Sequence, residues 1–160
     1  MFDRLHPVAK VLERARDEAA VLGSQDLEAE HILLALAAGD DPVVHGVLTG
    51  AGLDRDALRR ALEAQEEAAL ASVGVSRAAF DLPPRPPLKR TPGWSTSAKQ
   101  AMIRAKTIAT ARHEARLEPP HLLIGVLRAE AGPVPRALAF ASADPRLMAA
   151  ETETALAGRH

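Results

Sequence analysis

The chain has no cysteine, no tyrosine and few other aromatic residues. Only 2% of its 160 residues are aromatic, namely three Phe and one Trp. The absence of cysteine excludes disulfides and thiolate metal sites, and it fits a reducing compartment. Because aromatic and β-branched residues are scarce, alanine and leucine must fill the interior of a chain that is 47% hydrophobic. This composition favours helices packed on helices over a sheet.

An excess of charge and a long apolar run are also missing. Lys and Arg total 20 against 21 Asp and Glu, so the net charge of −1 excludes a general attraction to nucleic acid or acidic membranes. No stretch approaches the length of a membrane span, and the first residues carry charges where a signal peptide needs an apolar run. These features predict a cytoplasmic protein.

Catalytic and metal-binding constellations are missing as well. The chain has neither a G-x-S-x-G elbow nor a G-x-x-x-x-G-K-[ST] phosphate loop. His31 and His121 begin apolar segments, but Ala35 and Gly125 occupy the positions four residues later, where a second metal ligand would stand. We therefore expect buried structural histidines, and a protein that is not an enzyme and holds no metal or cofactor.

Helical periodicity and helix-stopping residues divide the first half of the chain into four helices. Apolar residues recur at three- and four-residue steps before Gly23, and the next apolar run is too hydrophobic for a surface helix, which predicts a buried central helix. Asp54 is placed as an N-cap. The expected helices cover residues 8–22, 31–39, 42–49 and about 54–71.

The same pattern returns in the second half of the chain. The segment PHLLIGVL copies EHILLAL, so that His121 follows His31 by 90 residues. A helix over 133–140 matches the third helix, and Asp144 followed by Pro145 predicts a cap and start for a last helix that ends near Ala157. The repeat predicts an all-α fold of about eight helices, in two four-helix units related by a pseudo-twofold axis.

The two repeats are separated by an unusual segment. Residues 82–93 read LPPRPPLKRTPG and hold five of the twelve prolines, which predicts a stiff, extended linker. We divide the chain into a first repeat (1–71), an extra segment with this linker (72–93) and a degenerate second repeat (94–160). Ser76 is expected to cap a short turn. Arg85, Lys89 and Arg90 make the linker basic, and a solvated linker is the default interpretation over a contact with nucleic acid or an acidic protein.

These repeats resemble a known family. A first helix ending in a small-residue turn, followed by E-H-I-L-L-x-L, resembles the N-terminal domain of the Clp chaperone ATPases, above all the ClpC type. The matching segments are MFDRL, AKVLERARDEAAVLG, EHILLAL and GLDRDALRRAL in the first repeat and WSTSAKQAMIRA, PHLLIGVL and the stretch 133–156 in the second. The resemblance implies a module that recruits substrates and adaptors to an unfolding motor, here in a stand-alone form.

The resemblance also implies a ligand site at Glu30. In ClpC-type domains the Glu of each T-E-H motif binds phosphoarginine, and a carboxylate suits a guanidinium because it accepts two parallel hydrogen bonds. Pro120 stands at the equivalent place in the second repeat, so we expect that site to be lost. Ala29 and Pro119 replace the Thr of the motif, which removes its usual helix cap. The alternative for Glu30 is an ordinary acid favoured by the helix macrodipole.

Two aromatic residues carry a second implication of the resemblance. Actinobacterial ClpC-type domains bind cyclic-peptide antibiotics through an N-terminal Phe and the Phe that opens the second repeat. Phe2 and Trp94 stand at these places, and large rings are common anchors of peptide recognition. The alternative is that both rings seal the seam between the repeats.

The function predicted from the sequence is therefore a binding module of protein quality control. Its partners would be protein or peptide ligands, such as phosphoarginine-tagged proteins or cyclic-peptide antibiotics, and it would either deliver clients to a Clp ATPase or compete with it. A helical DNA-binding regulator is the rival, but the best recognition helix, DRDALRRALEAQEE, mixes signs and turns acidic. A structural relic that binds nothing is the third alternative.

Overall fold

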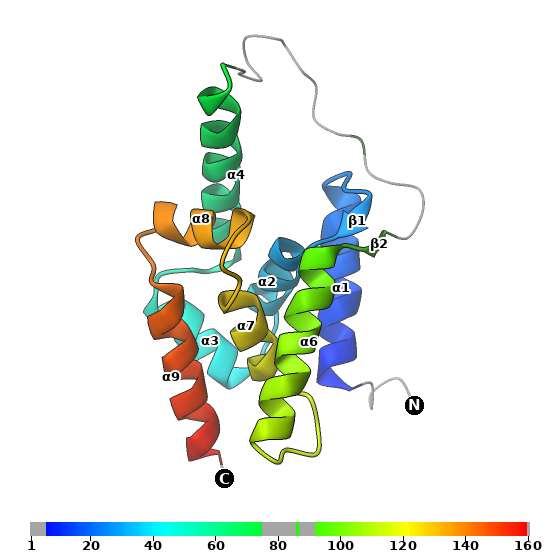
Figure 1. Cartoon of the computed structure of the whole chain (residues 1–160), viewed down its shortest axis with the longest axis vertical. Coiled ribbons are helices and arrows are strands. Elements are labelled where there is room, and N and C mark those ends of the chain that lie inside the picture. The colour runs from blue at the N-terminus through cyan, green and yellow to red at the C-terminus, as the bar shows by residue number, and fades with distance from the viewer. Residues whose placement is uncertain (1–5, 75–85, 87–91, 160) are drawn as a thin grey trace.

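Helices account for nearly all of the regular structure (Figure 1). The computed structural model describes residues 6–74, 86 and 92–159. Within these residues, the first repeat holds α1 (Pro7–Val21), α2 (Ala29–Ala38), α3 (Pro42–Gly50) and α4 (Arg55–Ser72), and the second holds α6 (Thr96–Ala111), α7 (Pro119–Leu127), α8 (Pro133–Phe140) and α9 (Pro145–Gly158). The predicted all-α fold of two repeats is confirmed.

Short polar side chains cap the starts of the helices, and residues in the left-handed backbone conformation end them. Asp54 accepts a hydrogen bond from the N–H of Ala57 at 2.7 Å, and Asp144 caps α9 in the predicted way. Gly23 ends α1 with a φ of 70°, whereas the second repeat places His113 at the equivalent point with a φ of 56°. A side chain in this region costs on the order of 1 kcal/mol, so the second repeat is the less regular copy.

The two repeats are packed reciprocally. Helix α7 begins 90 residues after α2, and α9 begins 90 residues after α4. Helix α4 of the first repeat packs on α8 of the second, while α9 packs on α3. The pairs α1 with α7 and α2 with α6 are exchanged in the same way. This exchange of equivalent helices is what a pseudo-twofold pair requires.

The core lies around the two central helices, α2 and α7 (Figure 1). Every residue of α7 is buried, as are Ala29 and residues 31–36 of α2, which confirms the predicted buried central helix. The largest fully buried side chains are almost all leucine and isoleucine: Leu27, Ile32, Leu33, Leu34, Leu53, Leu58, Leu122, Leu123, Ile124, Leu138, Leu156 and His121. The interior is therefore aliphatic, as the composition indicates.

A short parallel strand pair joins the repeats and was not expected from the sequence. Strand β1 (Asp26–Leu27) pairs with β2 (Gly93–Trp94), and the N–H of Ser95 donates to the carbonyl oxygen of Leu27 at 2.9 Å. Two residues are too few to show the alternation that identifies a strand. The turn predicted at Ser76 and most of the Pro-rich linker, with its basic residues, lie outside the described residues.

One ion-pair network ties the end of α9 to both repeats. Arg159 bonds to Asp41, the N-cap of α3, and to Glu118, the N-cap of α7, each at 3.0 Å. We expect Arg159→Ala to lower the free energy of unfolding by about 1 kcal/mol at most, because these groups are only partly buried. Urea denaturation should show the loss at low ionic strength, and about 1 M NaCl should remove it.

The control is Lys106→Ala, which removes an exposed cation from α6. The same loss of stability in both variants, or a loss that persists at high salt, would mean that the ion pairs do not tie the repeats together.

Candidate functional site

A groove between α1, α2 and α4 surrounds Glu30. Its volume is about 680 Å³. Among the described residues, five glutamates and one arginine supply the charge of its lining. The lining residues with polar side chains are Ser24, Glu28, Glu30, His31, Arg59, Glu63, Gln65, Glu66 and Glu67. We call this cavity the Glu30 groove. Such a concentration of carboxylates attracts cations and opposes the ionisation of each further carboxyl group.

Glu30 lies in the first turn of α2 with its carboxyl group partly buried in this groove. Burial raises its pKa to about 8, and a hydrogen bond to the Glu28 side chain and the negative charges of Glu28 and Glu66 act in the same direction. In the empty groove Glu30 therefore carries a proton near neutral pH. A cation bound beside it would favour the ionised form and displace that proton.

The start of α2 is capped without the Thr that Ala29 replaces. The ring of His31 accepts the N–H of the N-cap residue Glu28 through Nδ1 at 2.9 Å. The N–H of Ala29 donates to the hydroxyl of Ser97, in the other repeat, at 3.0 Å. The usual Thr cap is absent, as expected, and its place is taken by His31, two residues along the chain, and by Ser97 of the other repeat.

His31 has the structural role predicted for it. Its side chain is 5% exposed, and burial lowers its pKa, with Glu28 and Glu18 opposing the shift. The imidazole is therefore neutral, which suits its role as an acceptor. No group of three or more His, Cys, Asp or Glu side chains is positioned to hold a metal ion within the described part of the chain.

The carboxylates of α4 form one side of the Glu30 groove, and this was not predicted from the sequence. Glu63, Glu66 and Glu67 recur at three- and four-residue steps, so they share a face of the helix. Glu63 lies 3.6 Å from Arg59, which is the cation of the lining. The spacing was visible in the sequence, but only the packing of α4 against α2 shows which side chain this face surrounds.

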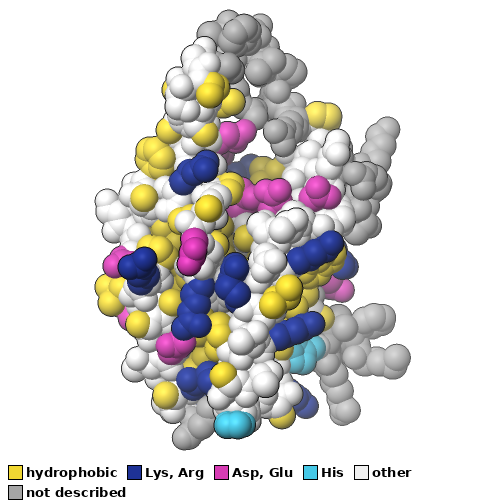
Figure 2. Space-filling model, in the orientation of Figure 1, with side chains coloured by type: hydrophobic (Ala, Val, Ile, Leu, Met, Phe, Trp, Pro, Cys, Tyr) yellow, Lys and Arg dark blue, Asp and Glu magenta, His cyan; other side chains and the backbone are white. Residues whose placement is uncertain are grey.

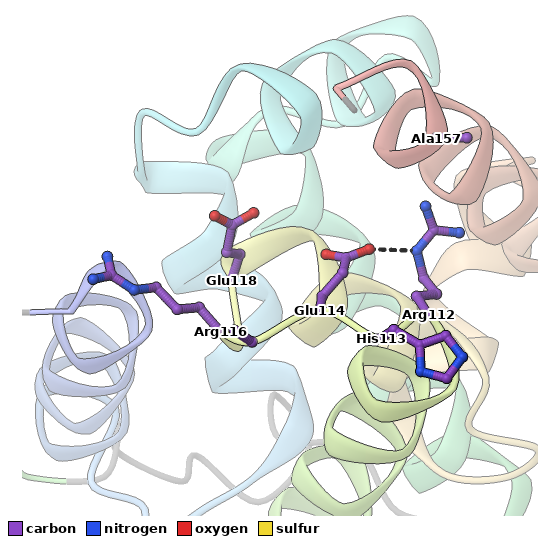
Figure 3. A pocket seen from close by; sticks show the side chains of 7 residues that line it. Arg112, His113, Glu114, Arg116, Glu118 and Ala157 are labelled. Atoms are coloured by element: carbon purple, nitrogen blue, oxygen red, sulfur yellow. Dashed lines mark hydrogen bonds and ion pairs between the residues drawn. The ribbon is translucent and has the colours of Figure 1, made fainter.

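The second repeat has a counterpart of this groove with a different lining. A cavity of about 670 Å³ is lined by Arg112, His113, Glu114, Ala115, Arg116, Glu118 and Ala157 (Figure 3). In Figure 3, Glu114 and Glu118 lie in the middle, with Arg112 and Arg116 on either side. Pro120, the counterpart of Glu30, is buried and supplies no carboxylate. The two grooves therefore differ in charge.

A hydrogen-bonded network occupies the polar groups of this second cavity. His121 is fully buried, accepts the N–H of Glu118 through Nδ1 at 2.9 Å, and lies 2.8 Å from Glu114 through Nε2. The ring must therefore carry its proton on Nε2 and donate it to Glu114. Burial alone would raise the pKa of Glu114, but hydrogen bonds from Arg112 and His121 outweigh it and lower that pKa.

The other two predicted site residues are not brought to Glu30. Trp94 lies on β2, partly buried against the core, and it does not line the Glu30 groove. Phe2 lies outside the described residues. The packing of Trp94 between the repeats fits the alternative in which this ring seals the seam. Its role in binding stays a prediction.

Comparison with known proteins supplies the family. A model of the Clp repeat N-terminal domain matches residues 6–91 and 94–158, which is nearly the whole chain. The chain belongs to the Clp N-terminal domain family. The resemblance seen in the motifs is thereby confirmed, and the structure of this Clp N-terminal domain agrees with that of solved relatives. No curated protein matches the chain significantly.

Three solved structures share the fold at low sequence identity. The N-terminal domain of the chaperone ClpD from Arabidopsis thaliana is 22% identical, with a TM-score of 0.68 over 98% of this chain and 96% of that one. The Hsp104 N-terminal domain from Candida albicans is 15% identical, with a TM-score of 0.64 over 91% and 85%. A protein from a malarial secretion system is 17% identical, with a TM-score of 0.65 over 94% and 92%.

No single helix in the described residues is long and apolar enough to cross a membrane. Helices α2 and α3 reach that length and composition only as a pair, and they are bent by 102° at the break between them.

Proposed function

We propose that this Clp N-terminal domain is a binding module of protein quality control that recognises arginine side chains of client proteins at Glu30. Membership of the family supports a role in binding substrates or adaptors of a Clp chaperone. The observation that carries the proposal is the position of Glu30 in a groove whose lining is dominated by carboxylates. Phosphoarginine, which the family resemblance implies, is the first ligand to test.

The chemistry of the groove suits a guanidinium. A carboxylate can accept two parallel hydrogen bonds from arginine, and a partly buried pair of this kind is stronger than an exposed one. Arg59 is the group in the lining that could meet a phosphoryl oxygen, and its contact with Glu63 at 3.6 Å is long enough to be exchanged. The proposal includes one binding site, because Pro120 provides no carboxylate in the second repeat.

Calorimetric titration with phosphoarginine and with free arginine tests this function. We expect at least one of these two ligands to bind saturably, with a stoichiometry close to one, and we expect this binding to be lost in Glu30→Ala. The matched control is Glu13→Ala, which removes an exposed carboxylate from α1 and should leave the binding unchanged. Binding should also strengthen as the pH rises toward 8, because the ligand must displace the proton on Glu30.

The absence of heat with both ligands would contradict the proposal. Binding that survives in Glu30→Ala would move the site elsewhere, and Phe2 and Trp94 would then be tested by substitution with a cyclic peptide as the ligand.

A further inference from the structure

A second groove lies between α4 and α8. Its volume is about 620 Å³ and its lining consists of Gln65, Ala68, Ala69, Ser72, Arg136, Ala139 and Phe140. We call it the α4–α8 groove. Figure 2 shows hydrophobic side chains over the C-terminal half of α4 and over α8. Helix α4 thus lines both grooves. Its glutamates line the Glu30 groove, and Gln65 belongs to both linings.

The groove is open because the two repeats differ here. Helix α4 is 18 residues long and its counterpart α9 is 14, and the C-terminal end of α4 projects beyond α8 (Figure 1). The small side chains of Ala68, Ala69 and Ser72 leave the space beside this projecting end unfilled. A groove of this volume can accept several large side chains.

Large apolar side chains are exposed along the rim of the groove. Phe140 at the end of α8 is 54% exposed. The equivalent position in the first repeat is Gly50, which has no side chain. Val73, just after α4, is 73% exposed. The packing among the described residues therefore does not explain Phe140, whereas an exposed aromatic ring beside an apolar groove is typical of an interaction surface.

The charge of the groove indicates the sign of its partner. Arg136 is the charged residue of the lining, and it stands one helical turn before Phe140. Among the described residues, Arg136 forms no ion pair, and it is exposed. An approaching segment that carried a carboxylate at this point would pair with Arg136, whereas a cationic segment would be repelled.

We propose that the α4–α8 groove binds an amphipathic helix of a partner protein, with an apolar face against Phe140 and an acidic residue opposite Arg136. Helices commonly bind in this manner, with apolar anchors at three- and four-residue steps lying in a groove. A second copy of this chain fits less well. A twofold interface at this groove would join two copies of the same lining, whose described residues include a cation and no acid to pair with it.

Two synthetic helical peptides of about 18 residues test the charge and the groove together. Both carry leucine at positions i, i+3, i+4 and i+7, and they differ only in flanking Glu or Lys residues. Fluorescence anisotropy with the whole chain should show saturable binding of the Glu peptide, about tenfold tighter than that of the Lys peptide. Phe140→Ala should weaken the Glu peptide about tenfold.

Charge reversal provides the readout that a folding defect cannot imitate. Arg136→Glu should reverse the preference, so that the Lys peptide binds more tightly than the Glu peptide. Glu13→Gln, on the exposed side of α1 and outside both grooves, should leave both affinities unchanged. The proposal is wrong if the Glu peptide does not bind up to about 1 mM, if both peptides bind the wild-type chain equally, or if Phe140→Ala has no effect. Sedimentation velocity that shows a dimer lost in Phe140→Ala would instead identify self-association.

Discussion

Gly125→Ala should destabilise this protein by about 3 kcal/mol, because a methyl group at this position has no room. Gly125 lies in α7, where a Cβ atom would stand 2.4 Å from the carbonyl oxygen of Ala101 and 3.2 Å from the backbone nitrogen of Ala105. Both atoms belong to the backbone of α6, so the two helices would have to move apart. Thermal unfolding should show a Tm lower by about 6–12 °C.

The control for this variant is Gly46→Ala. Gly46 lies inside α3, and nothing stands within 4 Å of the place its Cβ would take. Alanine there should raise the free energy of unfolding by about 0.5–1 kcal/mol, because glycine weakens a helix interior. If Gly125→Ala were as stable as the wild type, the close approach of α6 and α7 would be wrong.

Glu30→Gln should remove a large pH dependence of stability. Because burial and Glu28 raise the folded-state pKa of Glu30 to about 8 from an ordinary 4.5, the native state holds an extra proton between these pH values. The contribution of Glu30 to the free energy of unfolding is therefore fully present below pH 4.5 and is lost as the pH rises toward 8. The slope is at most about 1.4 kcal/mol per pH unit, since one proton is involved.

Denaturation at a series of pH values measures this effect as the difference between wild type and variant. Other titratable groups near Glu30 contribute to both proteins, and their effects largely cancel: Glu18 on α1, Glu28 and His31 on α2, and Arg59, Glu63, Glu66 and Glu67 on α4. We expect Glu30→Gln to gain stability relative to the wild type as the pH rises from 5 to 9. Parallel curves would contradict the assignment of this proton to Glu30.

Most helix positions could be predicted from the sequence because their signals are local. Asp54 and Asp144 cap α4 and α9 through their own side chains, and Gly23 ends α1 through its own backbone freedom. Each signal acts within four residues of the helix end, so no tertiary information is needed. The repeat of this pattern after 90 residues then predicted the architecture.

The candidate site was predicted only in part. Glu30 is visible from its motif, but its environment comes from glutamates of α4 that follow it by more than thirty residues in the chain. The hydroxyl of Ser97 that receives the N–H of Ala29 lies in the other repeat. Neither contact has a periodic signal, because both depend on how helices from distant parts of the chain pack.

The sequence by itself determined the helical class, the two repeats, the family and the loss of the carboxylate at Pro120, since these follow from composition and local pattern. Tertiary structure alone decided the raised pKa of Glu30, the close contact at Gly125 and the two grooves that α4 lines. The physical reason is that burial, charge and free space belong to sets of side chains that only packing brings together. The sequence specifies the residues, but the electrostatic environment and the free space around each residue arise only in the folded state.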